Sequence, residues 1–133
     1  VESPSAPSSE MILVDTSIWI DHLRSGDNAL ANALGGRTVL THPFVIGEIA
    51  LGNLRQRALV MTLLQGLPTA RVATNVEALA FIETHKLSGT GIGLIDAHLL
   101  VSVKLTPVAR LWTRDRRLHE IAARMKLAAD NVS

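Results

Sequence analysis

Four acidic residues stand where acids are uncommon, and their placement suggests shared chemistry. Asp15 directly follows the apolar run 12–14, and Asp115 closely follows the run 110–113, so both lie at the carboxyl ends of expected strands. Open sheets of parallel strands bind their ligands at that edge. Each Asp could instead cap the helix that follows it, which stabilises a helix by about 1 kcal/mol.

The other two acids lie on expected helices, on or beside otherwise apolar faces. Glu48 comes four residues after Phe44, and Asp96 comes four residues before Leu100. Residues four apart share one face of a helix, so both acids should project toward the buried side. Two structural alternatives stay open. Glu48 could keep its head group in water at the margin of the face, and Asp96 could be favoured by the helix dipole.

Carboxylates that converge need a compensating charge. Two of them about 4 Å apart repel by roughly 4 kcal/mol at an effective dielectric near 20, which exceeds the stabilisation that a cap gives. The chain has no cysteine, so thiolate metal sites are excluded. A site made of oxygen donors suits a hard divalent cation, Mg²⁺ or Mn²⁺, which can activate water and stabilise charge on a phosphoryl oxygen.

Basic residues gather near Asp115. Seven lie between residues 104 and 126: Lys104, Arg110, Arg114, Arg116, Arg117, Arg124 and Lys126. Only Asp115 and Glu120 oppose them there. A basic surface beside an acidic site fits a polyanionic substrate, although a solvated helix face is the simpler alternative. Aromatic residues make up only 3% of the chain, so stacking of bases on aromatic rings should not dominate.

Strand and helix signals alternate from residue 11 onward. Strands are expected at 12–14, 38–41 and 110–113, with a weaker signal at 70–73. Helices are expected at 15–24, 29–34, 44–54, 55–65, 75–86, 94–104 and 116–125. In the fifth of these, Leu79 and Ile82 should face inward, with Phe81 as a further candidate. Short apolar strands joined by helices predict an α/β fold, a three-layer α/β/α sandwich with a mainly parallel central sheet.

The length of 133 residues predicts one domain, which we place at residues 11–133. Residues 1–10, VESPSAPSSE, are interpreted as an expression remnant or a flexible native tail. The last residues could add an edge strand or fray. No apolar run approaches the roughly 18 residues of a membrane span, so no membrane partner is expected. The glycine-rich segment 87–93 lacks the Gly-Lys-Ser/Thr of a phosphate-binding loop and is expected to be mobile.

Four segments together resemble the PIN-domain ribonucleases, and more narrowly the VapC toxins of bacterial toxin–antitoxin pairs. The segments are ILVDTSIWIDHL, FVIGEIALG, GIGLIDAHLLVSV and LWTRDRRLHEIA. The resemblance implies a PIN-like α/β/α sandwich and an endonuclease that cleaves RNA with Mg²⁺ or Mn²⁺. It places the family's acids at Asp15, Glu48, Asp96 and Asp115, and it matches the accompanying hydroxyls to Thr16 and Thr113.

The resemblance also implies roles and partners. Asp15, Asp96 and Asp115 would hold one or two metal ions, and Glu48 would position or deprotonate the attacking water. Arg114, Arg116 and Arg117 would follow the RNA backbone. A cognate antitoxin would cover the acidic pocket, two copies would pair through residues 44–64, and the protein would work in the cytoplasm.

Three other functions would require different sequence features. A ribonuclease-H-like nuclease places its first acid in an antiparallel meander, for which no hairpin signal exists here. A phosphatase of the haloacid dehalogenase type needs a second acid two residues after the first, where this chain has Ser17. In a non-catalytic binding module, the four acids would be caps or solvated groups.

Overall fold

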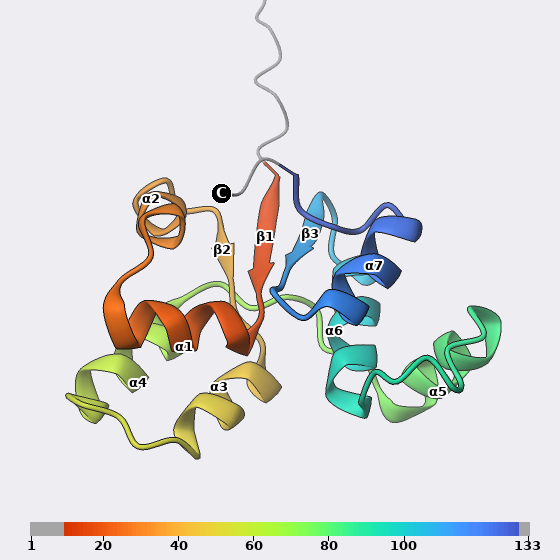
Figure 1. Ribbon diagram of the computed structural model, residues 1–133, viewed down its shortest axis with the longest axis horizontal. Helices are drawn as coiled ribbons and strands as arrows, with labels where there is room; N and C mark the ends of the chain where they lie inside the picture. The colour runs from red at the N-terminus through yellow and green to blue at the C-terminus, as the bar shows by residue number, and fades with distance from the viewer. Residues whose placement is uncertain (1–9, 131–133) are drawn as a thin grey trace, which may run out of the picture.

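The computed structural model describes residues 10–130, and its centre is a small parallel sheet (Figure 1). The strands are β1 (Met11–Val14), β2 (Val39–Leu40) and β3 (Ala109–Trp112), in the order β2-β1-β3. β1 pairs with both neighbours, so its end lies in the middle of the carboxyl edge.

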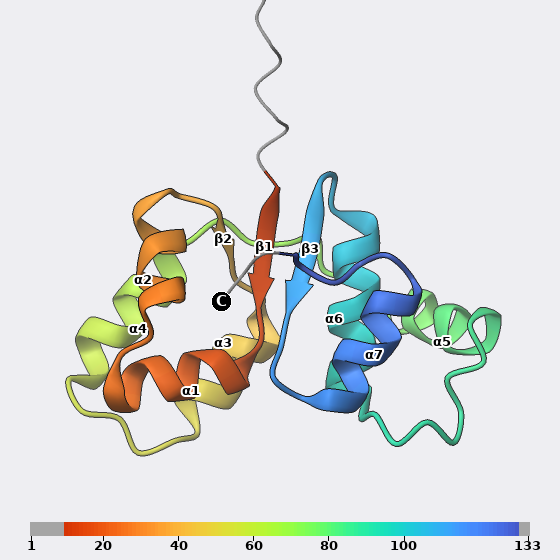
Figure 2. The same ribbon diagram turned by 45° about the horizontal axis from the view of Figure 1, so that its top comes forward.

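Helices lie on both sides of this sheet. They are α1 (Thr16–Ser25), α2 (Asn28–Gly35), α3 (Pro43–Ala50), α4 (Arg57–Gly66), α5 (Asn75–Thr84), α6 (Leu94–Leu105) and α7 (Arg116–Arg124). Figures 1 and 2 show α1–α4 on the β2 side and α5–α7 on the β3 side. The expected α/β class, with a parallel sheet between helices, is confirmed. No helix within residues 10–130 is long and apolar enough to cross a membrane.

The sequence explains this arrangement. Leu13 and Val14 are fully buried in succession, as a strand needs when both of its faces are covered. Residues 97–103 of α6 are all buried, so α6 is a core helix next to β3. α7 buries only Leu118, Ile121 and Ala122, which fall on one face of an amphipathic helix.

Two details differ from the sequence-based expectations. Segment 70–73 is no strand, and the only pairing nearby is a single bridge between Thr41 and Thr69. The reason is that Arg71 and Val72 are both exposed, so no continuous apolar run is buried there. On α5, Phe81 is buried and Ile82 packs against the core as expected, but Leu79 is 60% exposed and Ala78 takes the inward position instead.

The segment after α7 was expected either to add an edge strand or to fray. Leu111 bridges Ala128 in parallel, so the chain after α7 adds one residue to the β3 edge of the sheet. Apart from Glu10, the predicted tail at 1–10 lies outside the described residues, as do 131–133.

Candidate active site

Asp15 occupies the centre of the site, directly after the middle strand. Its side chain is almost fully buried, and its Oδ2 accepts hydrogen bonds from Thr113 Oγ1 at 2.7 Å and from Ser17 Oγ at 3.0 Å. Thr113 is the cross-strand neighbour of Asp15, because Val14 and Trp112 are paired one residue earlier. Although Asp15 stands at the N-cap of α1, its side chain makes no capping hydrogen bond. The capping alternative is therefore wrong for Asp15.

Asp115 stands at the corresponding junction after β3 and does cap its helix. Its Oδ1 accepts from the backbone amide of Leu118 at 3.0 Å. The hydroxyl of Thr113 links the two junctions, since it donates to Asp15 and accepts from the backbone amide of Asp115 at 3.0 Å. For Asp115 the capping alternative is right, but it uses one carboxylate oxygen only.

Glu48 reaches the same edge from α3. Its Oε1 accepts from Thr16 Oγ1 at 2.7 Å, and Thr16 directly follows Asp15. Glu48 is only half-buried, which agrees with a position at the margin of the apolar face. This hydrogen bond joins the start of α1 to α3.

Asp96 lies in the first turn of α6, where its Oδ2 accepts a long hydrogen bond of 3.4 Å from the backbone amide of Gly93. Burial raises the pKa of the Asp96 carboxyl above its ordinary value, and the charges of Asp15, Asp115 and Glu48 raise it further. The Gly93 amide acts in the opposite direction. All three other acids thus act electrostatically on Asp96, so the four acids face one region of the structure.

The four carboxylates share a pattern of hydrogen bonding. In the described structure each has one oxygen that accepts at least one hydrogen bond and a second oxygen that accepts none. Within residues 10–130, however, no three His, Cys, Asp or Glu side chains stand close enough together to form a ready-made metal site. The acids form an open cluster whose free oxygens a hard cation could draw together. The donor set and the raised Asp96 pKa both fit such an ion.

Comparison with known proteins agrees with this geometry. Residues 12–124 match the PIN domain family. The chain belongs to the PIN-domain family. It is also similar to "Ribonuclease VapC32" of Mycobacterium tuberculosis, in strain CDC 1551 / Oshkosh and in strain ATCC 25618 / H37Rv. Each is 48% identical over 124 residues, which cover 92% of this chain and 100% of the relative.

The three predicted RNA-binding arginines of this PIN domain differ in their surroundings. The Arg114 guanidinium donates to the carboxylates of Asp21 and Asp27. Arg116 Nε lies 3.6 Å from the Glu120 carboxylate in a highly exposed pair. Arg117 lies against Gly91, in the glycine-rich loop that precedes α6.

Sequence reasoning overlooked two polar groups. Ser17 Oγ donates to Asp15 and accepts from the backbone amide of Arg114 at 3.2 Å. The Asp-Thr-Ser run could have signalled this, because both hydroxyls follow the first acid directly. His42 is completely buried at the N-cap of α3, where its Nδ1 accepts from the Phe44 amide at 3.0 Å and its Nε2 lies 3.1 Å from Ser102 Oγ.

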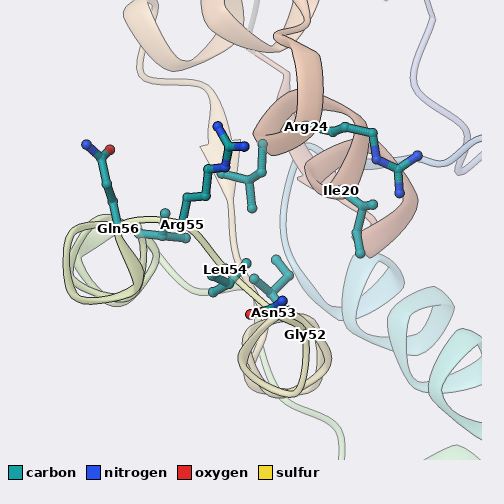
Figure 3. Close-up of a pocket in the computed structure, with 10 residues that line it drawn as sticks. Ile20, Arg24, Gly52, Asn53, Leu54, Arg55 and Gln56 are labelled. Atoms are coloured by element: carbon teal, nitrogen blue, oxygen red, sulfur yellow. The ribbon is translucent and has the colours of Figure 1, made fainter.

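A groove runs between α1 and the α3–α4 connection (Figure 3). Its apolar lining includes Ile20, Ile49, Leu54 and Val60, and its cations are Arg24 and Arg55. Figure 3 shows that Arg24 and Ile20 come from the same helix, whereas Leu54 and Arg55 come from the connecting segment. We call it the α1–α4 groove.

Proposed function

We propose that this PIN-domain protein is a divalent-metal-dependent endoribonuclease and the toxin of a toxin–antitoxin pair. The observation that carries the proposal is the set of four carboxylates at the carboxyl edge of the sheet, each with one oxygen that accepts no hydrogen bond within residues 10–130. A relative that is 48% identical over its full length and is named a ribonuclease supports the same activity.

Asp15, Asp96 and Asp115 would hold Mg²⁺, or Mn²⁺ in its place, through their free oxygens. Bound there, the ion would activate water and stabilise negative charge on the phosphoryl group. The hydroxyls of Thr113 and Ser17 would keep the Asp15 carboxylate in one orientation, since both donate to the same oxygen.

Glu48 is the proposed general base. Thr16 holds its Oε1, which leaves Oε2 free to take a proton from the attacking water. Attack on phosphorus opposite the 3′ oxygen forms the new P–O bond and breaks the P–O3′ bond. A proton from solvent water on the leaving oxygen then gives a 3′-hydroxyl and a 5′-phosphate.

Arg114, Arg116 and Arg117 are the proposed contacts to the RNA backbone. All three are exposed and flank Asp115. Arg114 would exchange the carboxylates of Asp21 and Asp27 for phosphates. We place this activity in the cytoplasm, where the RNA is.

The proposed antitoxin would occupy the α1–α4 groove. The apolar lining with Arg24 and Arg55 complements a segment that combines apolar and acidic side chains. Because Ile49 lines the groove and directly follows Glu48 in the chain, such a segment could continue toward the acids and block the site. Reversing both charges, with Arg24→Glu and Arg55→Glu together, should weaken antitoxin binding and leave RNA cleavage intact.

A homodimer through α3 and α4 is also proposed. Leu51, Leu59 and Leu63 are large apolar side chains exposed on or next to these helices. A protein that sediments as a monomer at high concentration would contradict this assignment.

Asp96→Asn tests the proposed function. Cleavage of RNA with Mg²⁺ should fall by about 100-fold or more, on the scale of removing one electrostatic group from an active site. The midpoint of thermal unfolding should stay the same or rise, because the amide removes a charge that its neighbours repel. Glu83→Gln, the same chemical change at an exposed position of α5, is the control and should cleave like wild type.

A titration with Mn²⁺ separates the nuclease from a binding module. Binding to the native fold should raise the thermal midpoint of the wild-type protein, and the shift should shrink in Asp96→Asn. Full activity in Asp96→Asn would end the assignment of that residue, and a wild-type protein that neither shifts with Mn²⁺ nor cuts RNA would contradict the proposed function.

A further inference from the structure

A second pocket lies next to the acid cluster, under the loop of residues 87–93. Ile82 of α5, Leu87 and Ile92 of the loop, and Leu94 and Ala97 of α6 supply its apolar lining. We call it the loop pocket. It adjoins the site, because two of its lining residues are Gly93, which donates to Asp96, and Ala97, which directly follows Asp96.

The size of the loop pocket limits its occupant. Its volume is about 250 Å³, below the 300–1,000 Å³ that is common for pockets holding drug-sized molecules. A single flat ring system, such as a nucleobase, suits this space. The side chains of Ile82 and Leu94 offer apolar surface to its faces.

The loop also offers groups that can pair with the edge of a base. In the described structure, the backbone amides of Gly91 and Ile92 donate no hydrogen bond to another protein group. Both residues line the pocket. Free amides beside apolar surface are what a site needs in order to orient a polar ring.

A cation is fixed at the same loop. A Cβ atom on Gly91 would lie only 2.5 Å from Arg117 Nη1, and the φ angle of Gly91 is +90°. The backbone conformation therefore favours glycine there, and the Arg117 guanidinium lies against it. Arg114 and Arg116 pair with carboxylates, whereas Arg117 has no ion pair within residues 10–130.

We propose that the loop pocket binds one base of the RNA next to the scissile phosphate, and that Arg117 binds the phosphate of that nucleotide. This inference rests on the proposed endoribonuclease function. The base contact gives the enzyme a preference at one position beside the cut, and the phosphate contact adds affinity without regard to sequence.

Cleavage profiles test the base contact. The purified full chain cuts a pool of random RNA with Mg²⁺, and the new 5′-phosphate ends are sequenced. Ile82→Phe fills the pocket and should change the preference at one position beside the cut by about fivefold or more. Leu79→Phe, the same enlargement on the exposed face of α5, is the control and should give the wild-type profile.

Ile82→Phe could misfold, and a thermal melt would reveal this. A second variant therefore tests the same contact. Leu94→Ala removes an exposed side chain from the rim without overpacking and should loosen the preference at the same position. If the wild type shows no preference beside the cut, or if both pocket variants keep its profile, the base contact is overturned. The second result would point to a protein side chain as the occupant.

Arg117→Ala tests the phosphate contact. Binding of RNA without divalent metal should weaken about equally for all sequences, and the dependence of log K on log salt should lose about one unit of slope. Arg37→Ala is the control, since Arg37 precedes β2 and lies at the opposite edge of the sheet. Unchanged affinity in Arg117→Ala overturns this contact. A wild type that binds RNA but cannot cut it contradicts the nuclease function instead.

Discussion

The middle strand and the two edge strands pass into their helices differently. His42 after β2 and Asp115 after β3 both use their side chains to cap α3 and α7. Asp15, after β1, leaves α1 uncapped and accepts from two hydroxyls instead. At all three strand–helix junctions a polar residue stands at the N-cap. Two of these side chains stabilise their helix, and the third, Asp15, does not.

This difference separates stability from function. A cap contributes about 1 kcal/mol, and α1 gives up that contribution although Asp15 is a favoured capping residue. What Asp15 gains is a fixed orientation at the centre of the carboxyl edge, beside the other acids. The proposed metal site includes this uncapped junction together with Asp115, whose second oxygen takes no part in the cap.

The largest expected effect is at the middle junction. Asp15→Asn should reduce kcat/KM for RNA by about 100-fold or more, because the amide supplies no anionic oxygen to a cation. Stability should stay near the wild-type value, since no cap is lost. Steady-state cleavage and denaturant unfolding measure the two effects, with Glu83→Gln as the control. A large loss of stability would mean that Asp15 is structural after all.

The junction after β2 should make the fold sensitive to acid. Burial, aided by the nearby His98, lowers the pKa of His42 to about 4 from 6.5. Between these values the unfolded chain binds the proton that the folded chain refuses, so the free energy of unfolding falls as the pH falls. The loss should reach up to about 3 kcal/mol at 1.36 kcal/mol per pKa unit.

Urea unfolding at several pH values measures this loss. Protonation of Nδ1 would also break the cap to the Phe44 amide. His42→Asn should flatten the pH dependence between 6.5 and 4, whereas His119→Asn, at an exposed position, should not. Equal slopes in both variants would show that other groups control acid unfolding.

At the junction after β3, two substitutions of Asp115 should separate its role as a helix cap from its proposed role in catalysis. Asp115→Asn keeps an oxygen for the Leu118 amide, so the folded state should be as stable as the wild type. Asp115→Ala should be less stable by about 1 kcal/mol. Both should lose RNA cleavage. Thermal melts and cleavage rates of the pair test this, and equal stability of the two variants would show that the cap is not needed.

These junctions also show what the sequence could reveal. The ends of β1 and β3, and the apolar faces that carry Glu48 and Asp96, were predicted from local patterns because strand ends and helix faces follow directly from residue spacing. Which Asp caps its helix was not predictable. That choice depends on Thr113 and Ser17, and Thr113 lies 98 residues from Asp15 in the chain.

Contacts between distant segments explain the other misses. Segment 70–73 forms no strand, and a single bridge at the neighbouring Thr69 takes its place. Pairing at the edge of a sheet depends on burial by other elements, which local sequence does not reveal. On α5 the expectation is wrong for Leu79, which is exposed, whereas the smaller Ala78 beside it in the chain is fully buried. The groove and the loop pocket combine separate elements and have no local signature.

The smallest expected effect is the loss of stability when the Arg114 side chain, which links the junction after β3 to the α1 side of the fold, is removed. Two links exist: the Arg114 backbone amide donates to Ser17, and the Arg114 guanidinium pairs with Asp21 and Asp27 and holds the pKa of Asp27 below its usual range. Arg114→Ala removes only the second. Because such exposed ion pairs contribute about 0–1 kcal/mol, stability should fall within that range at low salt and recover relative to wild type at high salt.

Unfolding at two salt concentrations, with Arg124→Ala on α7 as the control, measures the effect of Arg114→Ala. A salt-independent loss well above about 1 kcal/mol would mean that the guanidinium, and not the chain from Asp15 through Ser17 to the backbone, positions this junction. A small, screened loss would instead show that neutral hydrogen bonds keep the junction in place. Arg114 would then be free to leave Asp21 and Asp27 for a phosphate without loosening the site.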